Sequence, residues 1–193
     1  MSETPITTLL VFLFFLIILS AFFSSSETGM LSLNRYRLKH LKKSGHKGAI
    51  KASLLLKRTD QLISVILIGN NFVNILASSI ATVIAIRLWG DTGIAIATAG
   101  LTIILLIFAE ITPKTIAAYY PEKIAFPAAF ILGPLLKLMY PLVYLVNLIT
   151  NGLLRLAGIS TANADDQNLS TEELRTIVNE SGALLPKGKQ SML

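Results

Sequence analysis

The fold of this chain is decided by residues 101–114, whose sequence is LTIILLIFAEITPK. The stretch belongs to an apolar segment long enough to cross a bilayer as a helix, yet it contains the carboxylate of Glu110. Carboxylates in membrane spans usually face a bundle interior, a partner or an ion path, because lipid-facing charge is costly. Pro113 has no backbone N–H to donate, so the carbonyl of Ala109 loses its helical partner. The stretch therefore predicts a spanning helix with a cluster of oxygen atoms that suits a cation.

Hydrophobic residues make up 53% of the 193-residue chain, and they gather in three long runs, 6–23, 62–86 and 93–118. Each run can span about 30 Å of hydrocarbon as a helix. We therefore predict an all-α polytopic membrane protein with three transmembrane helices, at about 5–33, 60–88 and 92–118. The first residues, MSETP, lack the positive region of a signal peptide, so we expect the first run to be a retained helix. The absence of cysteine excludes disulfides and thiolate metal sites.

A basic cluster lies between the first two runs. A nucleic-acid-binding patch is one explanation of such a cluster, but its place between two spans favours the positive-inside rule, so we predict no nucleic-acid partner. The cluster then marks a cytoplasmic loop on anionic membrane lipid, with the N-terminus outside and the C-terminus in the cytoplasm. It holds nine of the 17 Lys and Arg residues and no acidic residue: Arg35, Arg37, Lys39, Lys42, Lys43, Lys47, Lys51, Lys57 and Arg58.

The segments around the spans predict shorter helices. Within 34–59, apolar residues at helical spacing, interrupted at Ser44-Gly45, predict two amphipathic helices on the inner membrane surface. Residues 119–158 are apolar but carry four prolines and several charges, which favours broken juxtamembrane helices, with a fourth crossing as the alternative. Residues 161–193 form a polar linker and a capping box at 170–173 that starts a soluble helix. We expect a truncated cytoplasmic regulatory region there.

Three polar clusters interrupt the spans: SSSETG at 24–29, GNNFVN at 69–74 and Glu110 with its neighbours. Asn70 and Asn74 are four residues apart and share one helix face, whereas Asn71 points about 100° away. Hydroxyl, carboxamide, carboxylate and backbone oxygens suit Mg²⁺, Ca²⁺ or Na⁺ rather than Zn²⁺ or Cu²⁺. The clusters therefore predict an intramembrane site for a hard cation.

Each polar residue also has a structural explanation. Intramembrane asparagines often bridge helices, and small serines let helix backbones approach. Glu27 can serve as a second ligand, as part of a coupling-ion site, or as an interfacial carboxylate paired with Arg35 or Lys114. We favour a structural or coupling role for Glu27. An enzyme that uses Ser24 with Lys114 as base lacks any supporting nucleophile motif, so we predict no enzymatic activity.

Four motifs in this order resemble the transmembrane domain of the CNNM/CorB/CorC magnesium transporters, and the bacterial CorB branch above all. They are FSSSETG at 23–29, LNRYR at 33–37, GNNFVN at 69–74 and AEITPK at 109–114, and the resemblance covers about residues 5–160. It implies a homodimer in a bacterial inner membrane, with a juxtamembrane helical belt at 119–158. In this family a paired CBS module that binds ATP with Mg²⁺ follows, so we expect no ATP site in this truncated chain.

The resemblance also implies a set of ligands for the transported ion. A largely dehydrated Mg²⁺ would be held by Ser24, Asn70, Asn74 and Glu110, together with backbone carbonyls. The family pattern has glycine where this chain has Ser25, so Ser25 or Ser26 can share the role of Ser24. The implied function is Mg²⁺ export coupled to Na⁺ entry by alternating access. The alternative is a Mg²⁺-sensing membrane anchor for a cytoplasmic regulatory domain, without transport.

Overall fold

The computed structural model describes residues 4–156, all of them in helices or short connections, with no strand in that range. The chain divides after Leu145 into two compact units, and the last helix continues into the second. The linker and soluble helix predicted for 161–193 lie outside the described residues. The elements are α1 Ile6–Leu31, α2 Arg35–Lys43, α3 Lys47–Leu55, η1 Leu56–Arg58, α4 Thr59–Trp89, η2 Gly90–Thr92, α5 Gly93–Ile104, η3 Leu105–Ile111, α6 Thr112–Tyr119, α7 Pro121–Leu138 and α8 Tyr140–Leu156.

Three helical segments are long and apolar enough to cross a membrane: Ile6–Leu31, Lys47–Trp89 and Gly93–Tyr119. The helices α7 and α8 make a fourth only if they count together as one broken span. The prediction of an all-α membrane protein with three spanning helices is confirmed. The third span is composite, since α5, η3 and α6 follow one another without a break.

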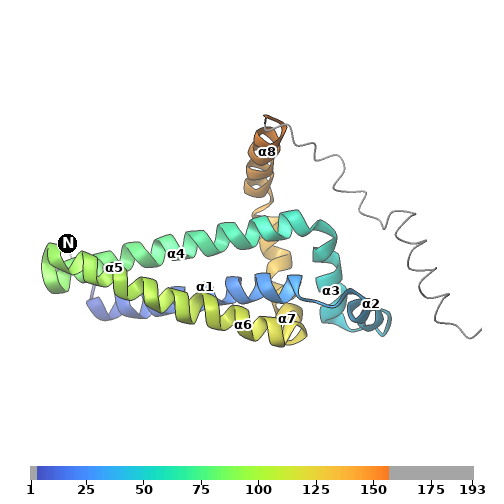
Figure 1. The fold of residues 1–193 in the computed structure, drawn as a ribbon, viewed down its shortest axis with the longest axis horizontal. Helices are drawn as coiled ribbons and strands as arrows, with labels where there is room; N and C mark the ends of the chain where they lie inside the picture. Colours follow the sequence, from blue (N-terminus) through green and yellow to red (C-terminus); the bar gives the residue numbers. More distant parts are fainter. Residues whose placement is uncertain (1–3, 157–193) are drawn as a thin grey trace, which may run out of the picture. The chain divides into compact units, whose positions relative to one another are not determined.

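Helix α1 is the centre of the spanning bundle. It packs against α4 on one side and against η3 and α6 on another, while α5 packs on α4 (Figure 1). The helices α1 and α4 pack tightly at Gly69, where an added Cβ would lie 2.6 Å from the ring of Phe23. The glycine therefore lets the aromatic ring of α1 lie directly on the backbone of α4.

Helices α2, α3 and α7 gather at one end of the bundle (Figure 1). The side chain of Asn34 caps α2 by accepting from two backbone N–H groups, and Nδ1 of His46 accepts from the backbone N–H of Ala49 to cap α3. Gly45 joins the two helices with φ +82°, a conformation that glycine adopts without strain. Two short helices thus form where the sequence predicts them, separated at the predicted break.

Helix α7 shows which prolines interrupt the chain. Pro121 and Pro141 lie in the first turns of α7 and α8, where the missing N–H has no helical partner to lose. Pro127 and Pro134 instead lie inside α7, which continues through both. Both side chains are exposed, so the helix absorbs them on its outer face. Only two of the four prolines therefore mark a boundary between helices.

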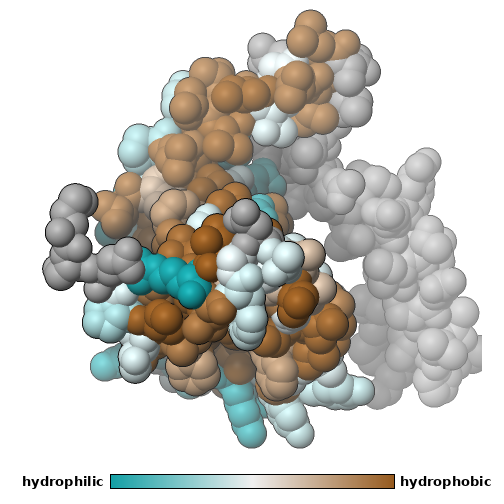
Figure 2. Space-filling view, turned by 90° about the vertical axis from the view of Figure 1, so that its left-hand side faces the viewer, coloured by the Kyte–Doolittle hydropathy of each residue, from teal (hydrophilic) through white to brown (hydrophobic). Residues whose placement is uncertain are grey.

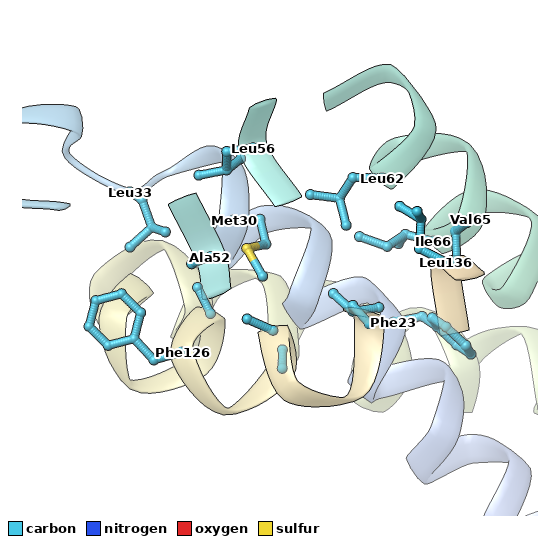
Figure 3. Packing of buried hydrophobic residues seen from close by; sticks show 14 of the residues in the cluster. Phe23, Met30, Leu33, Ala52, Leu56, Leu62, Val65, Ile66, Phe126 and Leu136 are labelled. Carbon is cyan, nitrogen blue, oxygen red and sulfur yellow. The ribbon is translucent and has the colours of Figure 1, made fainter. Parts of the chain in front are cut away.

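The buried apolar core joins the bundle to this end. Met30 of α1 is buried together with Ala52 of α3 and Leu62 of α4 (Figure 3). Leu136 of α7 belongs to the same cluster and lies beside Val65 in this view. The buried core therefore extends across the junction where α1 and α4 meet α3 and α7.

The flanks of the spanning helices carry exposed hydrophobic side chains. Phe14 of α1, Ile75 of α4 and Ile96 of α5 are each more than 65% exposed. Figure 2 looks at the end where α4 turns into α5, and hydrophobic residues cover much of the visible bundle. Trp89 ends α4 and is 61% exposed, just before Gly90 turns the chain with φ +64°. Such a surface fits hydrocarbon, with an aromatic residue at the boundary.

Candidate functional site

Two asparagine side chains of α4 converge on one serine of α1. The hydroxyl of Ser20 lies 3.0 Å from Oδ1 of Asn70 and 2.7 Å from Oδ1 of Asn74, in each case as donor. Ser20 is fully buried and Asn70 is 8% exposed. Because Asn70 and Asn74 are one helical turn apart, both reach the same point on α1. Three hard oxygen atoms therefore meet between two apolar spans.

The hydroxyl of Ser20 can satisfy both asparagines. It donates its one hydrogen to one carboxamide oxygen, and the other asparagine can turn its amide so that an N–H donates to the serine oxygen. With both carboxamide oxygens toward Ser20, as in this structure, the cluster presents three oxygen atoms that a cation could bind.

Ser24 lies one turn along α1 from Ser20, on the same helix face. Its side chain is fully buried, and its hydroxyl has no hydrogen-bond partner. Ser26 is likewise buried without a partner, whereas Ser25 donates to the carbonyl of Phe22 in its own helix. Buried polar groups rarely lack partners unless they have a function or bind a group from outside the chain. This pattern favours Ser24 or Ser26 over Ser25 as an ion ligand.

The segment around Glu110 is a π-helix. At the end of η3 the backbone N–H of Thr112 donates to the carbonyl of Ile107, five residues back. Pro113 follows immediately, and the wider turn gives its ring room next to the preceding backbone. Glu110 is half-buried in this segment, and no hydrogen bond or ion pair engages it within residues 4–156.

Glu27 has a partner, unlike Glu110. Its carboxylate Oε2 lies 3.7 Å from Nζ of Lys114, so α1 is tied to α6 across the end of the π-helix. Of the alternatives for Glu27, the structure therefore contains the ion pair with Lys114. Arg37 of α2 forms a second such link, since its Nε lies 2.6 Å from Oε1 of Glu122 in α7.

The predicted ligands lie on α1 and on two elements that pack against it, α4 and η3. Asn70 and Asn74 are joined through Ser20, and Ser24 is on the same face of α1. Glu110 lies on η3, which also packs against α1, but no hydrogen bond links it to the other three. Among the described residues, no group of three His, Cys, Asp or Glu side chains is placed to hold a metal ion. The candidate site thus has one carboxylate and otherwise neutral oxygens.

Sequence reasoning missed Ser20 and the π-helix. Ser20 is the residue four positions before Ser24, so the helical repeat that paired Asn70 with Asn74 also pairs these two serines. That spacing was a usable signal. The π-helix had a weaker one, the proline at 113, which predicts a disturbed backbone but not its geometry.

Comparisons with known proteins agree with this architecture. The family described as "Cyclin M transmembrane N-terminal domain" matches residues 11–186. The UPF0053 inner membrane protein YfjD of Escherichia coli strain K12 is 55% identical over 175 residues, which are 91% of this chain and 41% of that protein. A UPF0053 protein of Haemophilus influenzae is 52% identical over 186 residues, 96% of this chain and 44% of the relative.

A more distant relative has a functional name. It is a protein of Haemophilus influenzae named polyamine export protein, 30% identical over 181 residues, 87% of this chain and 41% of that protein. The chain therefore spans less than half the length of each of these three relatives.

Proposed function

The chain belongs to the family of the cyclin M transmembrane N-terminal domain, and from this premise we propose that it carries Mg²⁺ across a bacterial inner membrane. Membership makes it a multi-pass membrane protein of the transporter type. The finer proposal is Mg²⁺ export coupled to Na⁺ entry by a homodimer, with the N-terminus outside. A regulatory CBS pair that binds ATP would belong to a longer chain.

The observation that carries the proposal is the meeting of Ser20, Asn70 and Asn74 inside the spans. Mg²⁺ prefers six oxygen ligands in near-octahedral geometry. The two asparagines, Ser24 and Glu110 would supply four of them. Carbonyls released by the π-helix and Pro113 would add backbone ligands. One carboxylate among neutral oxygens holds a divalent ion loosely enough for it to leave again.

Shared binding of one ion would bring the third span and the asparagine pair together. Glu110 makes no hydrogen bond to either asparagine, and both carboxamide oxygens face Ser20. A Mg²⁺ ion that recruits both carboxamides and Glu110 would draw η3 along α1. The two arrangements of η3 would then be the two states of alternating access, with the π-helix as the flexible segment.

A polyamine is the second candidate cargo, because the more distant Haemophilus relative is named for polyamine export. A polyamine carries several ammonium groups and needs several carboxylates along its path. In the described spans, the carboxylates beyond the first turn of α4 are Glu27 and Glu110, and Glu27 is already paired with Lys114. A single free carboxylate fits one compact cation better than a polycation.

The test is Mg²⁺ flux in proteoliposomes that contain this chain, with and without an opposing Na⁺ gradient. We expect flux that depends on the gradient, that is lost in Glu110→Gln, and that excess spermidine does not inhibit. Competition by spermidine would favour the polyamine. Mg²⁺ binding without flux in the parent chain would support the alternative, a sensing membrane anchor. Unchanged Mg²⁺ binding in Glu110→Gln would contradict the proposed site.

A further inference from the structure

A basic pocket of about 590 Å³ lies between α3 and α7, away from the polar cluster of the spans. Its lining residues belong to α3, η1 and α7, and α3 and α7 lie at the end of the bundle where they gather with α2 (Figure 1). The pocket lies wholly in the first compact unit, and its lining includes Lys51, Leu54, Lys57, Arg58, Gly133 and Lys137.

Four cations surround this pocket, and no acidic residue lines it. Lys51 is held over the ring of Phe130, with Nζ 4.2 Å from the ring centroid. Lys57, Arg58 and Lys137 make no ion pair or hydrogen bond within the described part of the chain. They differ in this from Arg37 and Lys114, each of which has a carboxylate partner. Three unpaired cations around one hollow create a positive potential, which attracts an anion from outside the chain.

The rest of the lining is apolar. The side chain of Leu54 lines the pocket and is 55% exposed. Leu136 and Ala129 belong both to the pocket lining and to the buried core. At Gly133 an added Cβ would meet no atom within 4 Å, so the hollow extends to the backbone of α7. The pocket therefore combines a cationic rim with a hydrocarbon surface.

We propose that this pocket binds one anionic phospholipid. The phosphate would lie among Lys57, Arg58 and Lys137, and an acyl chain would lie along Leu54 and the open backbone at Gly133. A soluble phosphate would use the rim but not the apolar surface, and a zwitterionic lipid would leave the cations uncompensated. Basic pockets next to transmembrane helices are typical sites for anionic headgroups. The proposal does not depend on which cargo the spans carry.

The first test compares two variants that remove the same charge. Lys57→Ala, Arg58→Ala and Lys137→Ala together remove the three unpaired cations of the rim, whereas Lys39→Ala, Lys42→Ala and Lys43→Ala remove three cations of α2. The purified chain would be titrated with phosphatidylglycerol or phosphatidylcholine, and bound lipid counted by native mass spectrometry. We expect the parent and the α2 variant to retain phosphatidylglycerol preferentially, and the rim variant to lose it by at least about tenfold.

The second test keeps every charge and fills the hollow. Gly133→Leu places a side chain in open space, and Gly152→Leu is the matched control at an open glycine of α8. We expect Gly133→Leu to displace phosphatidylglycerol and Gly152→Leu to retain it, with equal helical content by circular dichroism. Equal retention of phosphatidylcholine, or equal loss in the α2 variant, would overturn the proposal. So would binding of glycerol phosphate alone that Gly133→Leu leaves unchanged, because the pocket would then take a soluble anion.

Discussion

The two sides of α1 differ in how their polar groups are satisfied. Toward α4, a regular helix lies close to α1 over Gly69, and Ser20 gives both asparagines a partner. Toward the third span, the backbone is π-helical and Glu110 has no partner within residues 4–156. Irregular helix geometry and unpaired polar groups are costly inside a membrane and usually mark a functional element. We therefore propose that the α4 side is the fixed half of the site and that the third span is the half that moves.

The largest effect is expected from Glu110→Gln set against Glu27→Gln. Removing the unpaired charge of Glu110 should lower Mg²⁺ flux by roughly 100-fold, since a charged ligand is lost. The same change should raise the Tm by roughly 2–4 °C, because an uncompensated carboxylate becomes neutral. Glu27→Gln removes the partner of Lys114, so it should lower the Tm instead. Thermal unfolding in detergent measures the Tm of each variant, and transport assays in vesicles measure Mg²⁺ flux. A lower Tm for Glu110→Gln would contradict the claim that Glu110 is unpaired while Glu27 is paired.

The next effect tests the fixed half with neighbouring asparagines. Asn70→Leu removes one acceptor of Ser20 and one proposed ligand, so Mg²⁺ flux should fall by about tenfold. Asn71→Leu is the control, because the Asn71 side chain is exposed and makes no hydrogen bond with Ser20. Its flux should equal that of the parent chain. Equal losses in the two variants would mean that this stretch of α4 matters for packing alone.

Gly69→Ala tests the close approach of α1 and α4. The new methyl group would collide with the ring of buried Phe23, and overpacking of this kind costs about 1–3 kcal/mol, which outweighs the gain of about 0.5–1 kcal/mol from replacing a helical glycine. Gly100→Ala adds the same group where no atom lies within 4 Å, and it should stabilise α5 by about 0.5–1 kcal/mol. Unfolding free energies from denaturant titration would show opposite signs. A Gly69→Ala variant as stable as its parent would mean that the two helices separate without cost.

The smallest effect is expected from Pro113→Ala. The change restores a backbone N–H and lets the π-helical turn close into an α-helix, which should slow flux about threefold by stiffening the third span. Pro127→Ala is the matched control, since Pro127 also lies inside a helix but on the exposed face of α7, outside the three spanning segments. Hydrogen exchange of the amides at 105–112 should slow in the first variant alone. Faster exchange there would contradict the link between the proline and the π-helix.

Much of the fold was predictable because its causes are local. Apolar runs of sufficient length define the spans, and the break at Ser44-Gly45 appears where Gly45 has positive φ. The breaks at Pro121 and Pro141 were also local, yet Pro127 and Pro134 looked the same in the sequence. Only the three-dimensional fold shows that the latter two lie on an exposed helix face.

The site was predictable in its chemistry and less so in its partners. Asn70 and Asn74 share a face through helical spacing, but the residue opposite them depends on how α1 is rotated and shifted. Periodicity within one helix does not contain that information. The ion pair of Arg37 with Glu122 joins residues far apart in the chain, and no sequence motif predicts it. Packing between helices decided each of these contacts.

The position of Trp89 makes it an intrinsic fluorescence probe of one end of the bundle. It is the only tryptophan in the sequence, and it is 61% exposed at the turn between α4 and α5. Its emission therefore reports one end of the bundle without any label. A quencher sealed on one face of a vesicle would dim the signal only in molecules that present this turn to that face. The ratio of dimmed to unchanged emission would thus measure how the protein inserts.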